Sequence, residues 1–190
     1  MTEKPFSREH LISPVDRDKM FMACQNMAER AMYVLIAWGG MRESEASHAR
    51  ATWWNGHALK VPKREECDCN DCRKRGYWKP KSKRGARTIP IRGFYRPFLT
   101  SFFKASPVGL GMGRITVWRR VKALARRAGL DPQGIFPHAF RATLASEFVA
   151  AFVDRFFIQE FFGWASIETA DSYVNVSEKL NAELRDKGLL

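Results

Sequence analysis

Two arginines, a histidine, a tryptophan and a tyrosine occur at spacings that suit chemistry on a phosphodiester. They lie in four short segments, namely Gly40–Glu45 with Arg42 inside it, His138–Arg141, Gly163–Trp164, and Tyr173. A phosphodiester under attack gathers negative charge on its non-bridging oxygens, and planar guanidinium groups match that charge with forked hydrogen bonds. The two arginines, Arg42 and Arg141, are therefore candidates for a clamp on the reacting phosphate.

Tyr173 is the candidate nucleophile of this group. A tyrosine hydroxyl is a weak nucleophile near neutral pH and needs activation, which cationic surroundings and a nearby proton acceptor would supply. The leaving 5′ oxygen needs a proton, which a lysine or a histidine can give. The indole N–H of Trp164 can donate to a phosphate oxygen but cannot shuttle a proton. Acid–base work would then fall to His138 and a lysine.

The composition fits a polyanionic partner. The chain has 190 residues, with 32 Lys and Arg against 20 Asp and Glu and a net charge of +12. A folded chain this basic most often binds nucleic acid, although a ribosomal or membrane-surface protein would carry a similar charge. At 45% hydrophobic and 13% aromatic residues the chain is expected to fold, and its length suits one domain over residues 1–190.

The location predicted from the sequence is cytoplasmic. No uncharged apolar run is long enough for a transmembrane helix. Residues 1–19 are polar and charged, unlike a signal peptide. Three of the four cysteines are clustered, which does not indicate the disulfide framework of a secreted protein.

Helices are predicted to carry most of the candidate residues. Ser13–Pro14 starts a helix whose apolar positions recur at helical spacing and which ends at Gly39–Gly40, just before Arg42. Pro137 starts a helix on which positions i and i+3, His138 and Arg141, share one face.

Other helix ends are expected further along the chain. Thr116 is predicted to cap a basic helix that ends at Gly129. Asp154 is predicted to cap a helix that closes at Gly163, and Ser166 to start the helix that carries Tyr173.

Residues 52–92 are predicted to form a β-hairpin region. Asn55–Gly56 is a tight-turn signal between the apolar stretches 52–54 and 58–61, and Arg87–Ile91 has the composition of a later strand. The region also contains the insertion Cys67-x-Cys69-x-x-Cys72.

The cysteine insertion is a candidate for a structural zinc site. Zinc takes four ligands, and three thiolates leave one position open. His57, ten residues before Cys67, is the candidate fourth ligand, and Cys24 is a weaker one. The alternative is a loop insertion whose thiols stay reduced. In either case a metal here would not touch the phosphate.

The order of these motifs resembles the catalytic domain of the tyrosine recombinases, the phage-integrase family, over roughly residues 8–180. The family pattern has an Arg in a Gly-x-Arg-x-x-Glu context, matched by Arg42 with Glu45 in support, and then His-x-x-Arg, matched by His138 and Arg141. A Gly-His or Gly-Trp pair follows, here with Trp164, and Tyr173 lies nine residues later. Trp stands where the family more often has His, a substitution known among active members.

The resemblance also implies a catalytic lysine in the β-hairpin, a few residues before an Arg-x-Val/Ile-Pro segment. Lys83 fits that position best and Lys81 is the second choice. Hairpin length varies in the family, so the sequence leaves both open.

The implied fold is mainly α with a small antiparallel β-sheet (α+β). The implied activity is that of a site-specific DNA recombinase, or integrase, which cleaves and rejoins strands through a 3′-phosphotyrosyl intermediate without a cofactor or catalytic metal. The implied partners are double-stranded DNA and further protomers in a tetrameric synapse. The cysteine insertion hints at an archaeal mobile element, within the wider expectation of a virus or plasmid integrase.

Three further expectations concern the ends of the chain and the activity. Only a short segment, residues 1–12, precedes the first helix, so the helical core-binding domain of full integrases is expected to be absent. Residues 177–190 are predicted to form a tail helix that docks on a neighbouring protomer or on its own. Relaxation of DNA in the manner of a type IB topoisomerase, or DNA binding without cleavage, are the alternative functions.

Overall fold

Helices account for most of the ordered structure in the computed structural model, which describes residues 10–173. The α-helices are α1 (Pro14–Met22), α2 (Met27–Tyr33), α3 (Glu43–Ala46), α4 (Arg96–Ala105), α5 (Arg114–Arg127), α6 (Pro137–Ala150) and α7 (Arg155–Phe162). Short π or 3-10 turns are η2 (Val34–Trp38), η3 (Ala51–Trp53), η4 (Lys83–Gly85) and η5 (Gly93–Tyr95). The strands are β1 (Ala58–Val61), β2 (Glu65–Glu66), β3 (Tyr77–Trp78) and β4 (Arg87–Pro90). The predicted mainly α fold with a small antiparallel sheet is confirmed.

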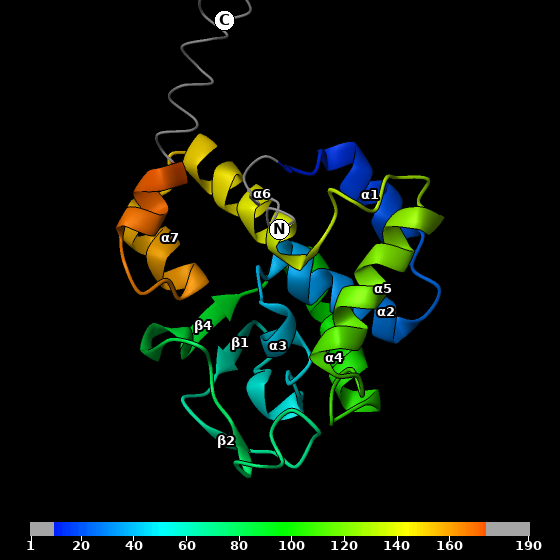
Figure 1. Cartoon of the computed structure of the whole chain (residues 1–190), viewed down its shortest axis with the longest axis vertical. Coiled ribbons are helices and arrows are strands. Elements are labelled where there is room, and N and C mark those ends of the chain that lie inside the picture. The colour runs from blue at the N-terminus through cyan, green and yellow to red at the C-terminus, as the bar shows by residue number, and fades with distance from the viewer. Residues whose placement is uncertain (1–9, 174–190) are drawn as a thin grey trace, which may run out of the picture.

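The strands form two antiparallel pairs beside the helices. β1 pairs with β4, with Leu59 opposite Ile89, and β2 pairs with β3. Figure 1 shows β1 and β4 next to α3 and below α7, with β2 at the end of the molecule away from α6. The long segment between β1 and β4 thus reaches away from the helices and returns to them.

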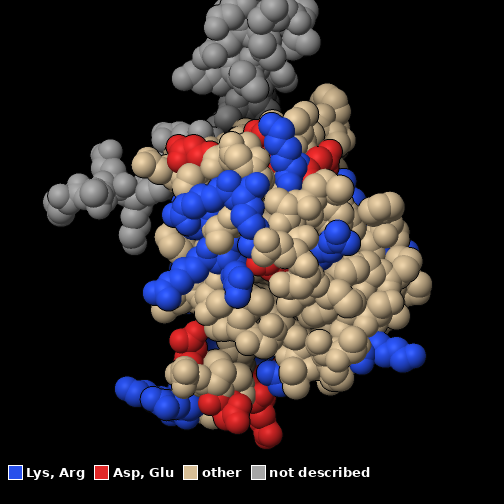
Figure 2. Space-filling model, turned by 90° about the vertical axis from the view of Figure 1, so that its right-hand side faces the viewer, with Lys and Arg blue, Asp and Glu red and all other residues tan. Residues whose placement is uncertain are grey.

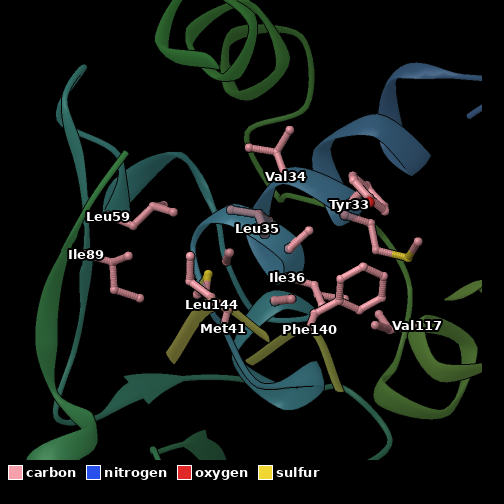
Figure 3. Packing of buried hydrophobic residues seen from close by; sticks show 14 of the residues in the cluster. Tyr33, Val34, Leu35, Ile36, Met41, Leu59, Ile89, Val117, Phe140 and Leu144 are labelled. Carbon is pink, nitrogen blue, oxygen red and sulfur yellow. The ribbon is translucent and has the colours of Figure 1, made fainter. Parts of the chain in front are cut away.

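The hydrophobic core surrounds η2. Leu35 and Ile36 of this turn are buried, as are Phe140 of α6 and Leu59 and Ile89 of the sheet. Figure 3 shows the sheet residues on one side of η2 and Phe140 on another. The turn that precedes Arg42 is therefore held by the sheet and by α6 at once.

The long helix predicted from Ser13 to Gly40 is wrong in one respect, because it is broken. α1 ends at Met22, and α2 begins after Asn26, whose side chain accepts a hydrogen bond from the backbone N–H of Glu29 at 2.9 Å. The Glu29 carboxylate in turn accepts from the N–H of Gln25 at 3.0 Å. This reciprocal capping starts a new helix within the apolar repeat.

Two other predicted boundaries also need correction. Residues 52–54 are not a strand, because Ala51–Trp53 form the 3-10 turn η3 and only Trp54 makes a bridge, to Leu59. The cap of α5 is Gly113 rather than Thr116. The Asp154 cap is confirmed, since its carboxylate accepts from the N–H groups of Phe156 and Phe157.

Parts of the predictions for the chain ends lie outside the described residues. These are the tail helix over 177–190 and most of the N-terminal segment 1–12. Among the helices of residues 10–173, none combines the length and apolar character that a membrane span requires.

Candidate active site

Arg42 stands at the start of α3, where the chain turns sharply. Gly40 has φ of +56°, and an added Cβ would lie 2.6 Å from the ring of Phe162. Only glycine meets both conditions without strain. Arg42 is half-buried, and both its backbone N–H and its Nη1 donate to the Glu45 carboxylate, at 3.0 and 2.8 Å. The turn and this pairing fix the guanidinium at the edge of the hollow described below.

Glu45 connects two arginines in the interior. Its side chain is 1% exposed, and Arg87 donates to both carboxylate oxygens, at 3.0 and 2.9 Å. Burial alone would raise the pKa of Glu45, but the Arg87 contacts, with the charges of Arg141 and Arg42, lower it to about 2. Glu45 is therefore ionised and holds Arg42 in place, as a supporting residue would.

Arg87 is a residue to which sequence reasoning gave no role. It also donates to the backbone carbonyl of Phe161 at 2.7 Å, so it ties β4 to α7. A local signal existed, because Arg87 and the core residue Ile89 alternate onto the same buried face of the strand. A buried arginine needs partners that accept its hydrogen bonds, often a carboxylate, but the sequence does not identify which one.

Arg141 and His138 lie on the same face of α6, as their spacing predicted. Arg141 is buried, donates to the carbonyls of Gly40 and Phe162, and lies 5.0 Å from the Phe162 ring centroid. Burial and the neighbouring Arg42 lower the pKa of Arg141 to about 9, so it keeps its charge at neutral pH. Two positive charges that act on each other and are only partly neutralised favour the binding of an anion beside them.

His138 differs from Arg141 in being exposed. Its Nδ1 lies 3.6 Å from a carboxylate oxygen of Glu43, and its side chain is 56% exposed. Desolvation lowers the pKa of His138, Glu43 opposes that shift, and the charges of Arg141, Arg42 and Lys81 add to it. The ring is therefore mostly neutral at physiological pH, and it lines the same surface hollow as Arg42.

Trp164 and Tyr173 are brought to Arg141 by a stack of rings. α7 ends at Gly163 with φ of +60°, as predicted, and the chain leaves the helix at Trp164. The Trp164 ring stacks on Phe162 at 4.9 Å and on Tyr173 at 5.3 Å, with only 5° between the last two planes. Tyr173 is 7% exposed, lies in the helical stretch 168–173, and is close enough to influence the pKa of Arg141.

The two candidate lysines occupy different places. Lys81 lines a surface hollow of about 450 Å³ together with Arg42 and His138. Lys83 begins η4 and lines a neighbouring hollow with three other lysines, one of which is Lys81. The structure thus brings the second choice, Lys81, beside Arg42 and His138, and the role of either lysine stays a prediction.

The segment that carries these lysines docks on the end of α7. Ser82 donates its hydroxyl hydrogen to the carbonyl of Gly163 at 3.0 Å. A Cβ on Gly163 would lie 2.8 Å from the carbonyl oxygen of Arg84, so the two backbones touch. This contact holds the lysine segment and Trp164 against each other.

The predicted partner of the cysteines, His57, is wrong. His57 lies exposed next to the Asn55 turn, while the side chain grouped with Cys67, Cys69 and Cys72 is that of His48. His48 follows α3 directly, and no local sequence pattern links it to the cysteines. Cys24 does not belong to the group, because its thiol is buried against the carbonyl of Met20.

Positive charge extends beyond the hollow. Figure 2 looks onto the side of the molecule where α4 and α5 lie, and it shows Lys and Arg side chains gathered over part of that face. The exposed basic residues of α5 include Arg119, Arg120 and Arg126. Arg114, at the start of α5, also lines the hollow that holds Arg42.

Comparison with known protein families gives a match to part of the chain. Residues 105–179 match the phage integrase family. A comparison with curated proteins gives no match.

Several solved structures share the fold. The crystal structure of XerA recombinase matches with a TM-score of 0.71 and 16% identity, over 97% of this chain and 66% of that chain. The Tn1549 transposon integrase in complex with circular intermediate DNA matches with a TM-score of 0.71 and 16% identity, over 90% and 63%. The integrase of mycobacterium phage Brujita matches with a TM-score of 0.63 and 18% identity, over 85% and 51%.

This chain thus spans two thirds or less of each of these three proteins. At these identities the structural likeness establishes the fold alone, and the similarity to the phage integrase family covers residues 105–179. Residues 105–179 are thus similar to the phage integrase family, within a fold that the chain shares with the XerA recombinase and Tn1549 integrase structures.

Proposed function

We propose that this chain is the catalytic domain of a site-specific DNA recombinase, an integrase, that breaks and rejoins DNA strands through Tyr173. The observation that carries the proposal is geometric: Arg141 donates to the carbonyl of Gly40, two residues before Arg42, and lies over Phe162. From Phe162 a stack of rings leads through Trp164 to Tyr173. Arg42 and Arg141 bring two positive charges to this place. Glu45 compensates part of this charge but is already shared with Arg87. The remaining positive charge suits a phosphodiester.

The proposed reaction begins with in-line attack on the phosphorus. The Tyr173 oxygen forms a bond to phosphorus and loses its proton, while the bond from phosphorus to the 5′ oxygen breaks. Arg42 and Arg141 bind the non-bridging oxygens, whose charge grows in the transition state. The Trp164 indole N–H is the proposed additional donor to one of these oxygens.

A proton must reach the leaving 5′ oxygen. The proposed sources are Lys83, from the family pattern, and Lys81, from its place in the hollow with Arg42 and His138. The mostly neutral ring of His138 suits the acceptance of a proton from the tyrosine.

The second half of the reaction is the reverse of the first. A 5′ hydroxyl attacks the 3′-phosphotyrosyl bond and releases Tyr173. Because one phosphodiester is exchanged for another through a covalent intermediate, no high-energy cofactor is needed. A strand from a partner duplex in the attacking position gives recombination.

The proposed partner is double-stranded DNA. The net charge of +12 and the basic face over α5 support this. Two of the similar proteins were solved as complexes, the Tn1549 integrase with circular intermediate DNA and the XerH recombinase with a difH substrate. A tetramer of this chain on DNA, action in the cytoplasm, and origin in a mobile element are part of the same proposal.

Covalent trapping tests the proposal. The protein is incubated with a duplex that carries a nick close to the cleavage site. Cleavage then releases a short fragment that diffuses away, so the strand cannot be rejoined. The sample is denatured and analysed for a covalent protein–DNA adduct. An adduct is expected with the wild type and none with Tyr173→Phe, which should still bind the duplex. The matched control is Tyr77→Phe on β3, which should form the adduct normally.

Other outcomes would redirect the assignment. Adduct formation by Tyr173→Phe would remove Tyr173 from the nucleophile role. Wild-type binding without any adduct would favour a DNA-binding protein that does not cleave. Relaxation of supercoiled plasmid without site preference would favour a topoisomerase-like activity.

A further inference from the structure

We propose that His48, Cys67, Cys69 and Cys72 bind a structural zinc ion. One ligand atom from each of the four side chains is available, and these atoms all lie within 4.8 Å of one another. The three cysteines are free of disulfides. A Cys₃His set is among the usual structural zinc sites, in which four protein ligands close the coordination sphere.

The spacing of the ligand atoms fits tetrahedral coordination. The Nε2 atom of His48 is 3.4 Å from the Sγ of Cys69 and 3.4 Å from the Sγ of Cys72. With Zn–S near 2.3 Å and Zn–N of 2.0–2.1 Å, a tetrahedral site separates sulfur and nitrogen by about 3.5 Å. One ring N–H points its hydrogen at a single acceptor, so two equal contacts fit a shared ion better than a hydrogen bond.

A second contact orients the His48 ring for this role. Its Nδ1 atom lies 2.7 Å from the backbone carbonyl oxygen of Ser44 in α3. A carbonyl only accepts, so Nδ1 carries the hydrogen and Nε2 keeps its lone pair toward the cysteines. Zinc-binding histidines commonly have this arrangement, because the outer hydrogen bond fixes both tautomer and orientation.

The backbone of residues 67–76 folds back to bring the thiols together. The N–H of Cys67 donates to the carbonyl of Gly76 at 3.1 Å, and the N–H of Arg73 to that of Cys69 at 2.8 Å. Gly76 has φ of +71°, which suits glycine at such a reversal. β2 and β3 pair on either side of the loop, so the segment returns as a closed knuckle.

The surroundings shield and balance the site. Trp78 stacks on the His48 ring with centroids 5.4 Å apart, and Trp53 packs on Trp78 at 5.0 Å. Zinc bound to three thiolates and a neutral imidazole leaves one net negative charge. The same loop carries Arg73, Lys74 and Arg75 against Asp68 and Asp71, and the one net positive charge of these residues balances the site.

The zinc would join two parts of the candidate active site. His48 is attached to α3, whose first turn contains Arg42 and Glu45, and the cysteine loop leads through Trp78 to Lys81. His48 and Cys72 line the same hollow as Arg42 and Lys81. The ion therefore holds the lysine segment beside the arginine helix, a consequence that rests on the proposed function, whereas metal binding itself does not.

Metal analysis of the purified full chain tests the site. We expect elemental mass spectrometry to find close to one zinc ion per chain. After replacement of the zinc by Co²⁺, we expect thiolate-to-metal charge-transfer absorption. His48→Ala and Cys72→Ser should lose most of the metal. His57→Ala and Cys24→Ala, matched in residue type, should keep it. A metal-free wild type after incubation with Zn²⁺, or equal loss in His57→Ala, would overturn the proposal.

A measurement on the wild type covers the case in which the variants fail to fold. Thiols are titrated with a colorimetric disulfide reagent before and after addition of a strong chelator. The site predicts that three more thiols react quickly once the chelator is present. Equal reactivity in both conditions would contradict it. Zinc content without covalent trapping would leave the metal site standing and count only against the proposed function.

Discussion

Arg42 and Arg141 have similar charges but different surroundings. Arg141 is buried and donates to two backbone carbonyls, of Gly40 and Phe162, whereas Arg42 stands at the rim of the hollow and is held by Glu45. Removal of the Arg141 side chain would therefore affect the packing of α6 against α7 as well as the proposed phosphate site. Arg42 is the better position at which to examine charge and geometry separately.

Arg42→Lys should keep the positive charge and lose the forked donor geometry. We expect single-turnover cleavage to fall by about 100–1000-fold, the usual effect of removing one donor to a developing oxyanion. DNA affinity should change little. Adduct formation on the nicked duplex measures the first quantity and gel-shift titration the second. Arg119→Lys on α5 is the control, and an equal loss of binding and cleavage in Arg42→Lys would mean that Arg42 only anchors the backbone.

The choice between Lys81 and Lys83 can be made by changing the leaving group. A duplex with sulfur in place of the 5′ bridging oxygen leaves as a thiolate, which needs no proton because thiols are far more acidic than alcohols. We expect Lys81→Ala to cleave ordinary DNA slowly and the sulfur-substituted DNA at a rate near wild type. Lys83→Ala should show a smaller defect. Rescue of Lys83→Ala instead would assign the proton donor to Lys83.

At the scale of elements, the site depends on close approaches between segment ends. The turn before α3 touches α7 through Gly40 and Phe162, and the lysine segment touches the end of α7 through Gly163 and Arg84. Each contact joins a candidate residue on one element to the backbone of another. The geometry of the site is thus sensitive to side chains added at these points.

Gly40→Ala should destabilise the protein by about 2–4 kcal/mol, because it combines a left-handed backbone with overpacking against Phe162. Gly129 has φ of +72° with nothing within 4 Å of an added Cβ. Gly129→Ala should therefore cost only the backbone strain, about 1 kcal/mol. Denaturant unfolding measures both. Equal losses would show that the contact with Phe162 relaxes freely.

Glu45→Gln should also destabilise the protein, by about 3–5 kcal/mol, since it leaves the buried Arg87 without its charged partner. The pKa of Glu45 is lowered to about 2, so its contribution is present above its unfolded-state value near 4.5 and is lost as the pH falls toward 2. That contribution is about 3 kcal/mol. The difference between wild type and Glu45→Gln, measured by unfolding across pH 2–7, should shrink within this acid range.

The exposed residue Glu66 on β2 provides the control for that series. Glu66→Gln should have the same free energy of unfolding as the wild type at every pH. A gap between wild type and Glu45→Gln that stays constant down to pH 2 would show that the carboxylate is not needed in its charged form.

For the molecule as a whole, charge should govern the proposed encounter with DNA. The net charge of +12 predicts DNA binding that weakens steeply as the salt concentration rises, because the release of counterions from the DNA is then less favourable. Arg119→Ala on the basic face of α5 should weaken binding to all sequences alike and lower the slope of log affinity against log salt by about one. Titrations at several salt concentrations measure this slope, with Glu66→Gln as the control. An unchanged slope would indicate that the DNA-binding surface does not include α5.

Local signals explain which elements could be predicted. The Asp154 cap and the Gly163 end of α7 rest on neighbouring backbone groups, so the sequence around them is sufficient. The start of α6 follows from Pro137. The break between α1 and α2 was missed, although Asn26 and Glu29 form a capping pattern that the apolar repeat obscured.

The sequence by itself determined which residues are candidates for the proposed chemistry, because Arg42, His138, Arg141, Trp164 and Tyr173 appear in short motifs whose residue types and order are visible. It also determined the fold class, since helical periodicity and caps are local properties. Long-range pairing was decided only in the tertiary structure, where elements far apart in the chain meet.

Three pairings of this kind shape the site. Arg87 meets Glu45 across 42 residues, His48 rather than His57 meets the cysteines, and Lys81 rather than Lys83 lines the hollow with Arg42. No local pattern encodes these choices. Each depends on how the β-hairpin region packs against α3 and α7, and that packing is set by buried contacts of the whole chain.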